Sequence, residues 1–331
     1  MKPLVRNVQL GRRHGGDPQT LHRRLLERLL IAHPILNRAM ALGAQVTLTL
    51  LIWPRFFAPY RWQLTRHPLR LAGLHPAFNG YRILQLTDLH VGKCRPDYLM
   101  RVIEASLAEK PNLTVITGDL IDYHPDALKL LPPILKKIMD LSRQAQASDG
   151  VVAIFGNHDY HEYSWRHVGP RAAHRAIHKR LVRIVEDAGI KLLRNQQHPI
   201  RRHNGQIVLV GLDEMWTGRA DPTAAFNGLT PQDAVICLQH NPDGIEFLRD
   251  FPWQFMICGH SHGGQALFPL LGALYVPMQH RQYLRGFFDF PHGHAGNEKR
   301  TMFVSRGIGH STPIRLRCRP EVTLFTLDST N

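Results

Sequence analysis

The chain has 331 residues, of which 44% are hydrophobic and 20% are charged. This composition excludes a disordered, collagen-like or coiled-coil chain and indicates a globular protein that can bury a full core. The four cysteines are far apart and form no C-x-x-C pair. That spacing argues against a disulfide scaffold or a zinc ribbon and fits a reducing compartment.

The net charge of +15 is concentrated near the N-terminus. Residues 1–80 hold twelve Lys and Arg against two Asp and Glu, so they carry +10 and the rest of the chain carries +5. Uniformly distributed basic residues would favour a nucleic-acid partner. A basic segment on a nearly balanced body favours contact with an anionic surface instead.

The segment 1–75 has the features of a membrane-associating helix. Leucines at helical spacing lie beside arginines in LHRRLLERLL (21–30), and no residue is charged in AMALGAQVTLTLLIWP (39–54). From Trp53 to Trp62 aromatic residues alternate with arginines, as in the aromatic belt of membrane proteins. The sixteen uncharged residues are fewer than the ~20 that a spanning helix needs.

Three interpretations of this segment compete: a helical extension packed on the body, a cleaved signal, and an interfacial anchor. A cleaved signal has little support, because no small-residue cleavage site follows Trp53. A packed extension is the ordinary role of a helix with one apolar stripe. We favour the anchor because the basic, apolar and aromatic stretches follow one another.

From Tyr81 onward, short apolar runs alternate with helix-length segments, which indicates a βαβ core. Since no linker divides this part, we expect a single domain at 76–331. The expected strands are 81–87, 113–117, 151–155, 207–211, 234–238, 255–258, 301–305 and 314–318, the expected helices are 96–110, 126–141 and 171–188, and Asn204-Gly205 is an expected hairpin turn.

Polar residues follow five of these strands at the point where each strand ends. A single His or Asp in such a place is usually a surface residue, a turn former or a helix cap. Five coincidences in a row are hard to explain in that way, because the carboxyl ends of strands in an open sheet meet at one edge. The residues are Asp88 and His90, then Asp119, then Asn157, His158 and Asp159, then His240, then His260 and His262.

The motif order D-x-H, G-D, G-N-H-D, H, G-H-x-H resembles the calcineurin-like metallophosphoesterase superfamily. The flanking segments GLDEMWTGRADP (211–222) and GHSHGGQ (259–265) are similar to a membrane-associated bacterial phosphodiesterase branch that includes UDP-2,3-diacylglucosamine pyrophosphohydrolases of lipid A synthesis. The resemblance covers about residues 55–327, and Ser261 replaces a Thr that is frequent in that branch. It implies an α/β fold, a four-layer α/β/β/α sandwich with a two-metal centre, preceded here by an N-terminal helical appendage.

Carried over residue by residue, the resemblance implies two metal sites that share one bridging carboxylate. Imidazole, carboxylate and amide oxygen ligands suit Mn, with Fe or Zn as alternatives, rather than Ca. Two such metals activate a bridging hydroxide and stabilise an in-line displacement at phosphorus. One site is assigned Asp88, His90 and His262, the other Asn157, His240 and His260, and Asp119 bridges both.

His158 remains outside this ligand set. We interpret it as a general acid, oriented by Asp159, that protonates the leaving oxygen; the alternative is a histidine that only hydrogen-bonds its loop. Substrate contacts are expected from arginines and polar residues of the branch-specific segments, although each is equally explained as a structural or solvated residue. These candidates are Asn195, Asp213, Arg219, Arg306 and Arg315. The basic helix 171–183 is either a cap facing the substrate or a solvated face.

The resemblance implies a hydrolase that cleaves a phosphodiester or diphosphate bond, with UDP-2,3-diacylglucosamine as the favoured substrate and UMP and lipid X as products. The expected location is peripheral or monotopic at the inner membrane, on its cytoplasmic face, with a lipid-linked substrate and an anionic membrane as partners. Neither a nucleic acid nor an obligate protein partner is expected. The alternatives are a metal-dependent nuclease or cyclic-nucleotide phosphodiesterase, and a non-catalytic, metal-stabilised membrane-binding module.

Overall fold

The computed structural model describes residues 23, 34–71, 73–144, 148–161, 171–290 and 299–329. The chain forms two compact units, Met1–Ile52 and Trp53–Asn331. The boundary therefore lies after Ile52, whereas the sequence analysis ends the N-terminal segment at residue 75. Residues 53–75 belong to the second unit, because β1 (Gln63–Arg70) pairs in parallel with β14 (Glu321–Asp328).

The first unit contains the helix α2 (Pro34–Thr47), which continues as the π-helical turn η1 (Leu48–Ile52). The apolar side chains of Met40, Leu42 and Leu51 are exposed. Together with α3 (Trp53–Phe56), the helical stretch Asn37–Phe56 has 20 residues and a mean hydropathy of 1.2, which is long and apolar enough to cross a membrane by these two criteria alone. Apart from residue 23, the basic stretch 21–30 lies outside the described residues.

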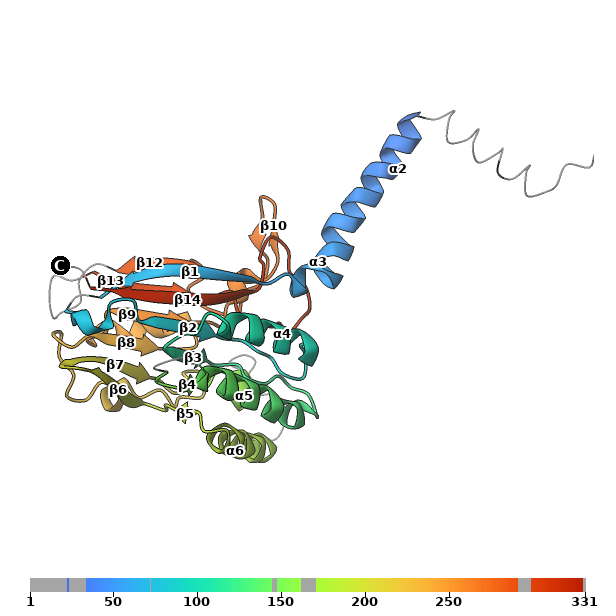
Figure 1. Ribbon diagram of the computed structural model, residues 1–331. Helices are drawn as coiled ribbons and strands as arrows, with labels where there is room; N and C mark the ends of the chain where they lie inside the picture. Colours follow the sequence, from blue (N-terminus) through green and yellow to red (C-terminus); the bar gives the residue numbers. More distant parts are fainter. Residues whose placement is uncertain are drawn as a thin grey trace, which may run out of the picture. The chain divides into compact units, whose positions relative to one another are not determined.

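The second unit is built on two six-stranded sheets (Figure 1). The strands β2, β3 and β4 of the first sheet are parallel, and so are β7, β8 and β9 of the second. The first sheet has the order β1-β14-β2 (Arg82–Leu86)-β3 (Leu113–Thr117)-β4 (Val151–Ile154)-β5 (Lys191–Leu192), and the second has the order β12 (Gly286–Phe290)-β13 (Arg300–Val304)-β9 (Phe255–Cys258)-β8 (Val235–Leu238)-β7 (Gly205–Gly211)-β6 (Gln196–Arg202).

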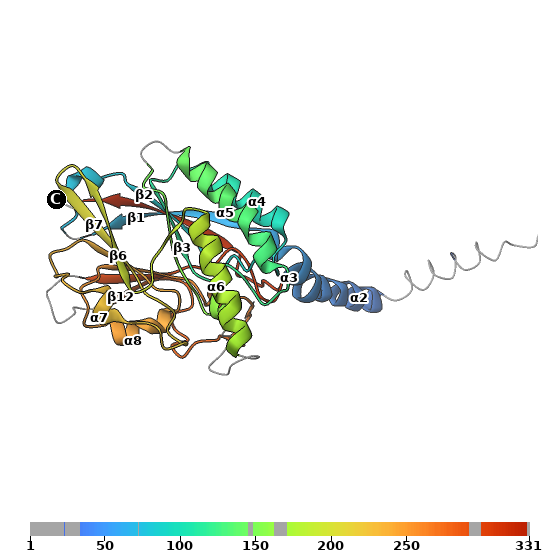
Figure 2. The ribbon, with the colours of Figure 1, turned by 90° about the horizontal axis from the view of Figure 1, so that it is seen from below.

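Helices cover the outer faces of both sheets, as Figure 2 shows. The first sheet carries α4 (Pro96–Leu107), α5 (Ala127–Arg143) and α6 (Arg171–Asp187), and the second carries the short helices α7 (Pro222–Ala225) and α8 (Ile245–Leu248). The central strands are buried on both faces, because one face packs against the other sheet and the opposite face packs against helices. In β2, for example, Ile83 lies in the core between the sheets, and its neighbour Leu84 packs toward the helices. The fold is the expected α/β/β/α sandwich, in which apolar cores lie on both sides of each sheet.

The predicted strands match the structure to within two residues, with one exception. Residues 314–318 were expected as a strand, but this prediction is wrong: the segment forms only an isolated bridge, Leu316 with Ala266. The alternation of apolar and polar residues does not mark the two faces of a strand here, because the polar Arg315 is buried beside the apolar Leu316. The predicted hairpin is present, with β6 and β7 joined around Asn204.

Candidate metal centre

Five strands bring their carboxyl ends to one place, where the two sheets meet. Asp88, Asp119 and Asn157 follow β2, β3 and β4 of the first sheet, and His240 and His260 follow β8 and β9 of the second. Backbone hydrogen bonds connect these loops: Asp88 N–H donates to the carbonyl of Gly118, and Gly259 N–H donates to that of His240. The loops are therefore fixed by the sheets that carry them.

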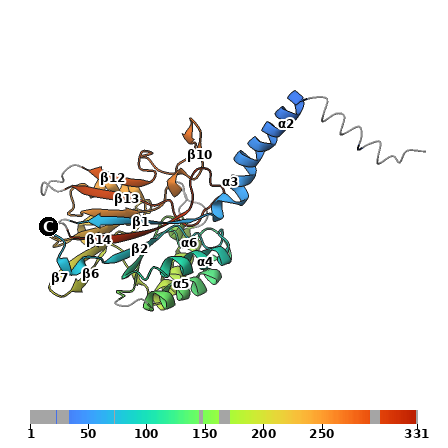
Figure 3. The ribbon, with the colours of Figure 1, turned by 45° about the horizontal axis from the view of Figure 1, so that its top comes forward.

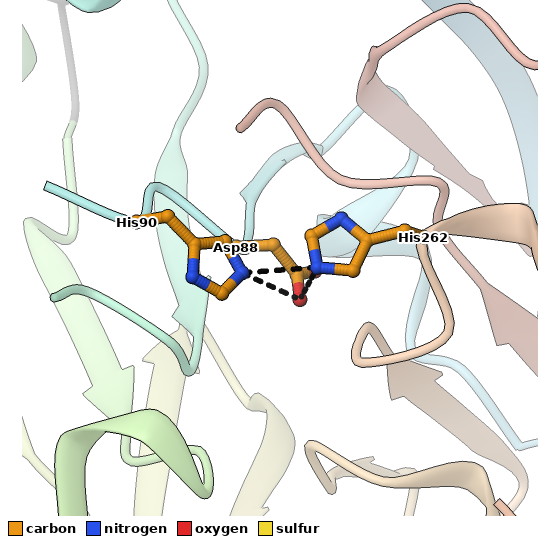
Figure 4. Close-up of side chains that lie close together, drawn as sticks. All are labelled: Asp88, His90 and His262. Atoms are coloured by element: carbon orange, nitrogen blue, oxygen red, sulfur yellow. Dashed lines mark hydrogen bonds and ion pairs between the residues drawn. The ribbon is translucent and has the colours of Figure 1, made fainter. Parts of the chain in front are cut away.

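Asp88, His90 and His262 form the first cluster of candidate ligands (Figure 4). The Nε2 atoms of His90 and His262 lie 2.9 Å apart, and they lie 4.0 Å and 3.5 Å from Oδ1 of Asp88. The side chains come from the loops after β2 and β9, so each sheet contributes to the cluster. All three residues are buried.

Asp119, His240 and His260 form the second cluster. Oδ2 of Asp119 lies 3.2 Å from Nε2 of His240 and 3.7 Å from Nε2 of His90, so this carboxylate lies between the two clusters. Oδ1 of Asn157 lies 2.9 Å from Nδ1 of His260. The structure thus brings together all seven residues to which the resemblance assigns a ligand role. His90 also belongs to a third group of possible ligands, with Asp122 and His158.

The outer ring nitrogen of three of the four histidines is held by an oxygen atom. His90 Nδ1 faces Asp122 Oδ2 at 3.0 Å, His240 Nδ1 faces the carbonyl of Thr117 at 2.7 Å, and His260 Nε2 faces the carbonyl of Pro277 at 2.9 Å. A hydrogen on each outer nitrogen leaves the inner nitrogen with a lone pair, and metal-binding histidines use this arrangement.

His262 differs from the other three histidines, because Nη2 of Arg315 lies 3.2 Å from its Nδ1. A guanidinium can only donate, so in this case the outer nitrogen is the acceptor. The tautomer argument therefore supports three of the four histidines as ligands. For His262 the support is its position beside Asp88 and His90.

Two glycines allow the loops to come this close. A Cβ atom on Gly156 would lie 2.2 Å from Oδ1 of Asp119, and one on Gly259 would lie 2.6 Å from Oδ2 of Asp88. Real side chains do not tolerate such distances, so only glycine fits beside these carboxylates. This requirement explains the glycine in G-N-H-D and the glycine in G-H-S-H.

The electrostatic environment favours a cation at this place. Although burial acts to raise it, the charges of His240 and His158 hold the pKa of Asp119 well below its usual value. Burial opposes a charge on His240, but Asp119 and Asp88 raise its pKa to about 10. Burial lowers the pKa of His260 to about 3, so this imidazole is neutral at pH 7. A field that favours a proton on His240 also favours a metal ion there.

The donor set fits divalent transition metals. It consists of imidazole nitrogens, carboxylates and one amide oxygen, without a thiolate, since all four cysteines lie outside the two clusters. His240 Nε2 is buried and faces Oδ2 of Asp119 at 3.2 Å, while its Nδ1 is held by the carbonyl of Thr117. A metal ion between the imidazole and the carboxylate would be bound by both.

His158 lies beside the clusters, and its carboxylate partner is not the one that the sequence predicts. The imidazole of His158 is 3.5 Å from Asp122. Burial acts to lower the pKa of His158, but the charges of Asp119 and Asp122 outweigh it and raise this pKa. Asp159 was expected to orient His158, but its carboxylate accepts from the backbone N–H groups of Leu120, Ile121 and Gly156. It therefore fixes the loops.

Asp122 is not among the residues predicted for the site, although its two oxygens face His90 and His158. The only signal was its position three residues after Asp119, in the run GDLID.

Two of the predicted substrate arginines have structural partners: Arg315 is buried, and the side chain of Arg306 is 15% exposed. Nη1 of Arg315 donates to the carbonyl of His262 at 2.9 Å, and Nη2 donates to that of Gly309 at 2.6 Å. Arg306 forms a two-point ion pair with Glu321, with distances of 2.9 Å and 2.7 Å. Neither guanidinium is therefore placed to bind a phosphate. Arg315 instead holds the loop of His262 in position.

The remaining candidates lie together in and beside the loop after β7. Asn195 accepts from the backbone N–H groups of Asp213 and Asp221, so it stabilises this loop. Asp213 accepts from Arg194 and from the Tyr160 hydroxyl and is buried. Among these predicted residues, Arg219 alone is exposed and borders a cavity, where its guanidinium lies 5.3 Å from the Tyr160 ring.

Two cavities adjoin the metal centre. One, of about 400 Å³, is lined by His158, His260 and His262 and by the residues after β9. The other, of about 810 Å³, lies between α6 and the loop after β7. Trp216 borders the larger cavity, and its ring packs edge-on against His260 with a centroid distance of 4.8 Å.

Comparison with known proteins agrees with this site. The family model of calcineurin-like phosphoesterase matches residues 81–264. The chain is similar to phosphodiesterase YaeI of Escherichia coli (32% identity, 81% of this chain and 89% of that protein) and to UDP-2,3-diacylglucosamine pyrophosphatase LpxG of Chlamydia muridarum (27%, 83% and 92%). A transmembrane protein with a metallophosphoesterase domain from Bos taurus is 27% identical over 77% of this chain and 55% of that protein. The chain therefore belongs to the calcineurin-like phosphoesterase family, whose members are metal-dependent hydrolases of phosphoesters.

Proposed function

We propose that the protein hydrolyses the diphosphate bond of a membrane-associated, lipid-linked nucleotide such as UDP-2,3-diacylglucosamine, releasing UMP and lipid X, with two divalent metal ions. Mn²⁺ is the first choice of metal, and Fe or Zn are the alternatives. The observation that carries this proposal is an apolar wall on the smaller cavity. Similarity to LpxG, a UDP-2,3-diacylglucosamine pyrophosphatase, supports the choice of substrate.

The wall belongs to residues 267–277, here called the apolar hairpin, which contains β10 (Leu267–Phe268) and β11 (Gly272–Ala273). Figures 1 and 3 show that it protrudes from its unit. Leu270 and Leu271 at the tip are fully and largely exposed, and Leu274 and Tyr275 are 62% and 74% exposed. Exposed apolar side chains in such a group usually mark a binding surface.

The apolar hairpin and the metal centre share one cavity. Phe268, Leu274, Tyr275 and Pro277 line it together with His158. A ligand in this cavity meets a polar, metal-binding end and an apolar wall, so it should be an amphiphile with a phosphate group. A purely polar substrate such as an oligonucleotide leaves the apolar wall without a role.

The residues of the chain have distinct roles in this proposal. Asp88, His90 and His262 would hold one metal ion, Asn157, His240 and His260 the other, and Asp119 both. The metal ions supply a water molecule of lowered pKa and positive charge for the phosphate oxygens. His158 lines the cavity and carries a proton that it can donate to the leaving oxygen. Asp122 orients the His158 and His90 rings.

Membrane association at the cytoplasmic face of the inner membrane forms part of the same proposal. The helical stretch Asn37–Phe56 is apolar and 6% buried, and Trp53, Phe56 and Phe57 are exposed. Similarity to a bovine transmembrane protein with the same domain supports a membrane location. A substrate with two acyl chains would be met at that surface.

The test is an assay of the purified, Mn²⁺-loaded protein on UDP-2,3-diacylglucosamine in mixed micelles. We expect stoichiometric UMP and lipid X, and no products with the Asp119→Asn variant. Bis-p-nitrophenyl phosphate and a single-stranded oligonucleotide serve as soluble comparisons. Hydrolysis of bis-p-nitrophenyl phosphate without release of UMP would overturn the substrate assignment. A higher kcat/KM for the oligonucleotide would indicate a nuclease.

A further inference from the structure

The cavity of about 810 Å³ between α6 and the loop after β7 is lined by cations. Arg175, Lys179 and Arg183 follow one another at four-residue intervals on α6, and so share one face of the helix. Arg219 faces the same cavity from the loop, and Glu186 is the only acidic residue that lines it in the described part of the chain. We call this cavity the basic pocket.

Among the described residues, the cations of the basic pocket lack paired carboxylates. In the described part of the chain, no carboxylate forms an ion pair with Arg175, Lys179, Arg183 or Arg219. Arg194 differs, because it is paired with Asp213 at 3.0 Å. Like charges four residues apart destabilise a helix, so this row of cations lowers the stability of α6 in the absence of an anion. Guanidinium and ammonium groups that converge on a cavity are typical of phosphate-binding sites.

One aromatic ring connects the basic pocket to the metal centre. Trp216 lines the pocket and contacts His260 edge-on, with a centroid distance of 4.8 Å. Tyr160, three residues after Asn157, lines the pocket below Arg219, whose guanidinium lies 5.3 Å from its ring. Trp216 therefore borders both regions, because it lines the basic pocket and contacts a candidate metal ligand.

We propose that the basic pocket is a second phosphate-binding site, which holds a non-reacting phosphate and its polar substituent while another phosphate of the same substrate is hydrolysed. The inference rests on the proposed function and deepens it, because it assigns a place to the polar half of the substrate. Arg183 and Arg219 on facing walls bind the phosphate, and Trp216 offers a ring surface to the attached sugar or base.

The experiment uses UDP as a competitive inhibitor of bis-p-nitrophenyl phosphate hydrolysis, at fixed ionic strength and with the full-length, Mn²⁺-loaded protein. Arg183→Gln should raise the inhibition constant of UDP about tenfold relative to the KM for bis-p-nitrophenyl phosphate, since one charge-assisted contact is lost. Arg180→Gln is the matched control: Arg180 is exposed on the same helix and does not line the pocket, so the constant should be unchanged.

Inorganic phosphate, tested in the same way, separates binding at the metal centre from binding in the basic pocket. A tenfold effect with UDP and a small effect with inorganic phosphate places the second phosphate in the pocket. Equal constants for Arg183→Gln and wild type, or equal shifts for Arg183→Gln and Arg180→Gln, would overturn the inference. Arg219→Gln on the facing wall repeats the test if Arg183→Gln fails to fold. None of these readouts requires a lipid substrate, so they remain decisive if UDP-2,3-diacylglucosamine is not hydrolysed.

Discussion

The two regions beside the metal centre have opposite chemistry. The apolar hairpin exposes leucines and a tyrosine around a cavity that contains His158, His260 and His262. The basic pocket presents cations from α6 and is connected to His260 through Trp216. An enzyme for a uniform substrate has no need of both surfaces. This difference fits the proposed substrate, which has an apolar and an anionic part with the scissile bond between them.

The largest effect on turnover should come from replacing Asp119, which lies in the metal centre beside both regions. Asp119→Asn removes a negative charge beside His240 and His90, so we expect a loss of more than about 10³-fold in kcat for lipid and soluble substrates alike. Elemental analysis should show reduced metal content in the same variant. Full metal content with normal turnover would show that Asp119 does not bridge the metal ions.

His158→Asn should separate catalysis from metal binding. We expect kcat to fall about 10²-fold, the usual contribution of a general acid, while metal content stays at the wild-type level. Asp122→Asn is the companion variant, with a smaller loss, since it acts through the His158 ring. If His158→Asn binds substantially less metal, His158 is a ligand and the assignment as general acid is incorrect.

Arginines that look alike in the sequence should respond differently. Arg306→Gln breaks a largely buried ion pair with Glu321 and should cost about 3 kcal/mol of unfolding free energy. Arg219→Gln should leave the Tm close to that of wild type, because Arg219 is exposed and without a carboxylate partner among the described residues. Chemical denaturation of both variants at pH 7 measures the difference.

The same ion pair predicts a pH dependence. Burial acts to raise the pKa of Glu321, but the hydrogen bond and charge of Arg306 hold it below its usual value. A depressed carboxyl pKa stabilises the fold above the unfolded pKa, and this stability is lost as the pH falls through the folded pKa. The stability gap between wild type and Glu321→Gln should therefore narrow as the pH is lowered from 7 toward 3, and a constant gap would contradict the ion-pair account.

The apolar hairpin should matter for lipid substrates. Leu270→Ser combined with Leu271→Ser removes the apolar tip, and we expect kcat/KM for a lipid-linked diphosphate to fall about tenfold, since two exposed leucines no longer enter the lipid phase. Leu270→Met combined with Leu271→Met keeps the tip apolar and is the control. Equal losses in the serine and methionine variants would show that shape, rather than apolarity, is required.

Removal of residues 1–52 should have the smallest effect on turnover. The deletion ends at the unit boundary and leaves β1 in its sheet. We expect hydrolysis of bis-p-nitrophenyl phosphate to be retained, whereas co-sedimentation with anionic vesicles should weaken, because most of the N-terminal basic residues are lost. Unchanged co-sedimentation would show that residues 1–52 are not needed for membrane contact and that the second unit makes it alone.

The ligand positions could be predicted from the sequence because their signal is local. Each lies directly after an apolar strand, and β2, β3, β8 and β9 have clear boundaries. The roles of Arg306 and Arg315 depend on partners that are far away in the chain or on backbone carbonyls, for which no local pattern exists. The strand β1 was not predicted because it contains charged residues and Pro68. The strand β14 was not predicted because the segment 314–318, which precedes it, also alternates apolar and polar residues and is predicted as the strand instead.

The backbone of the metal centre has an evolutionary consequence. Asp88, His90, Asp119, His260 and His262 all adopt positive φ angles between 46° and 67°. Residues other than glycine are held in this region at a cost of about 1 kcal/mol or more each. Selection for thermal resistance alone should therefore enrich glycine or asparagine at these positions and eliminate the reaction.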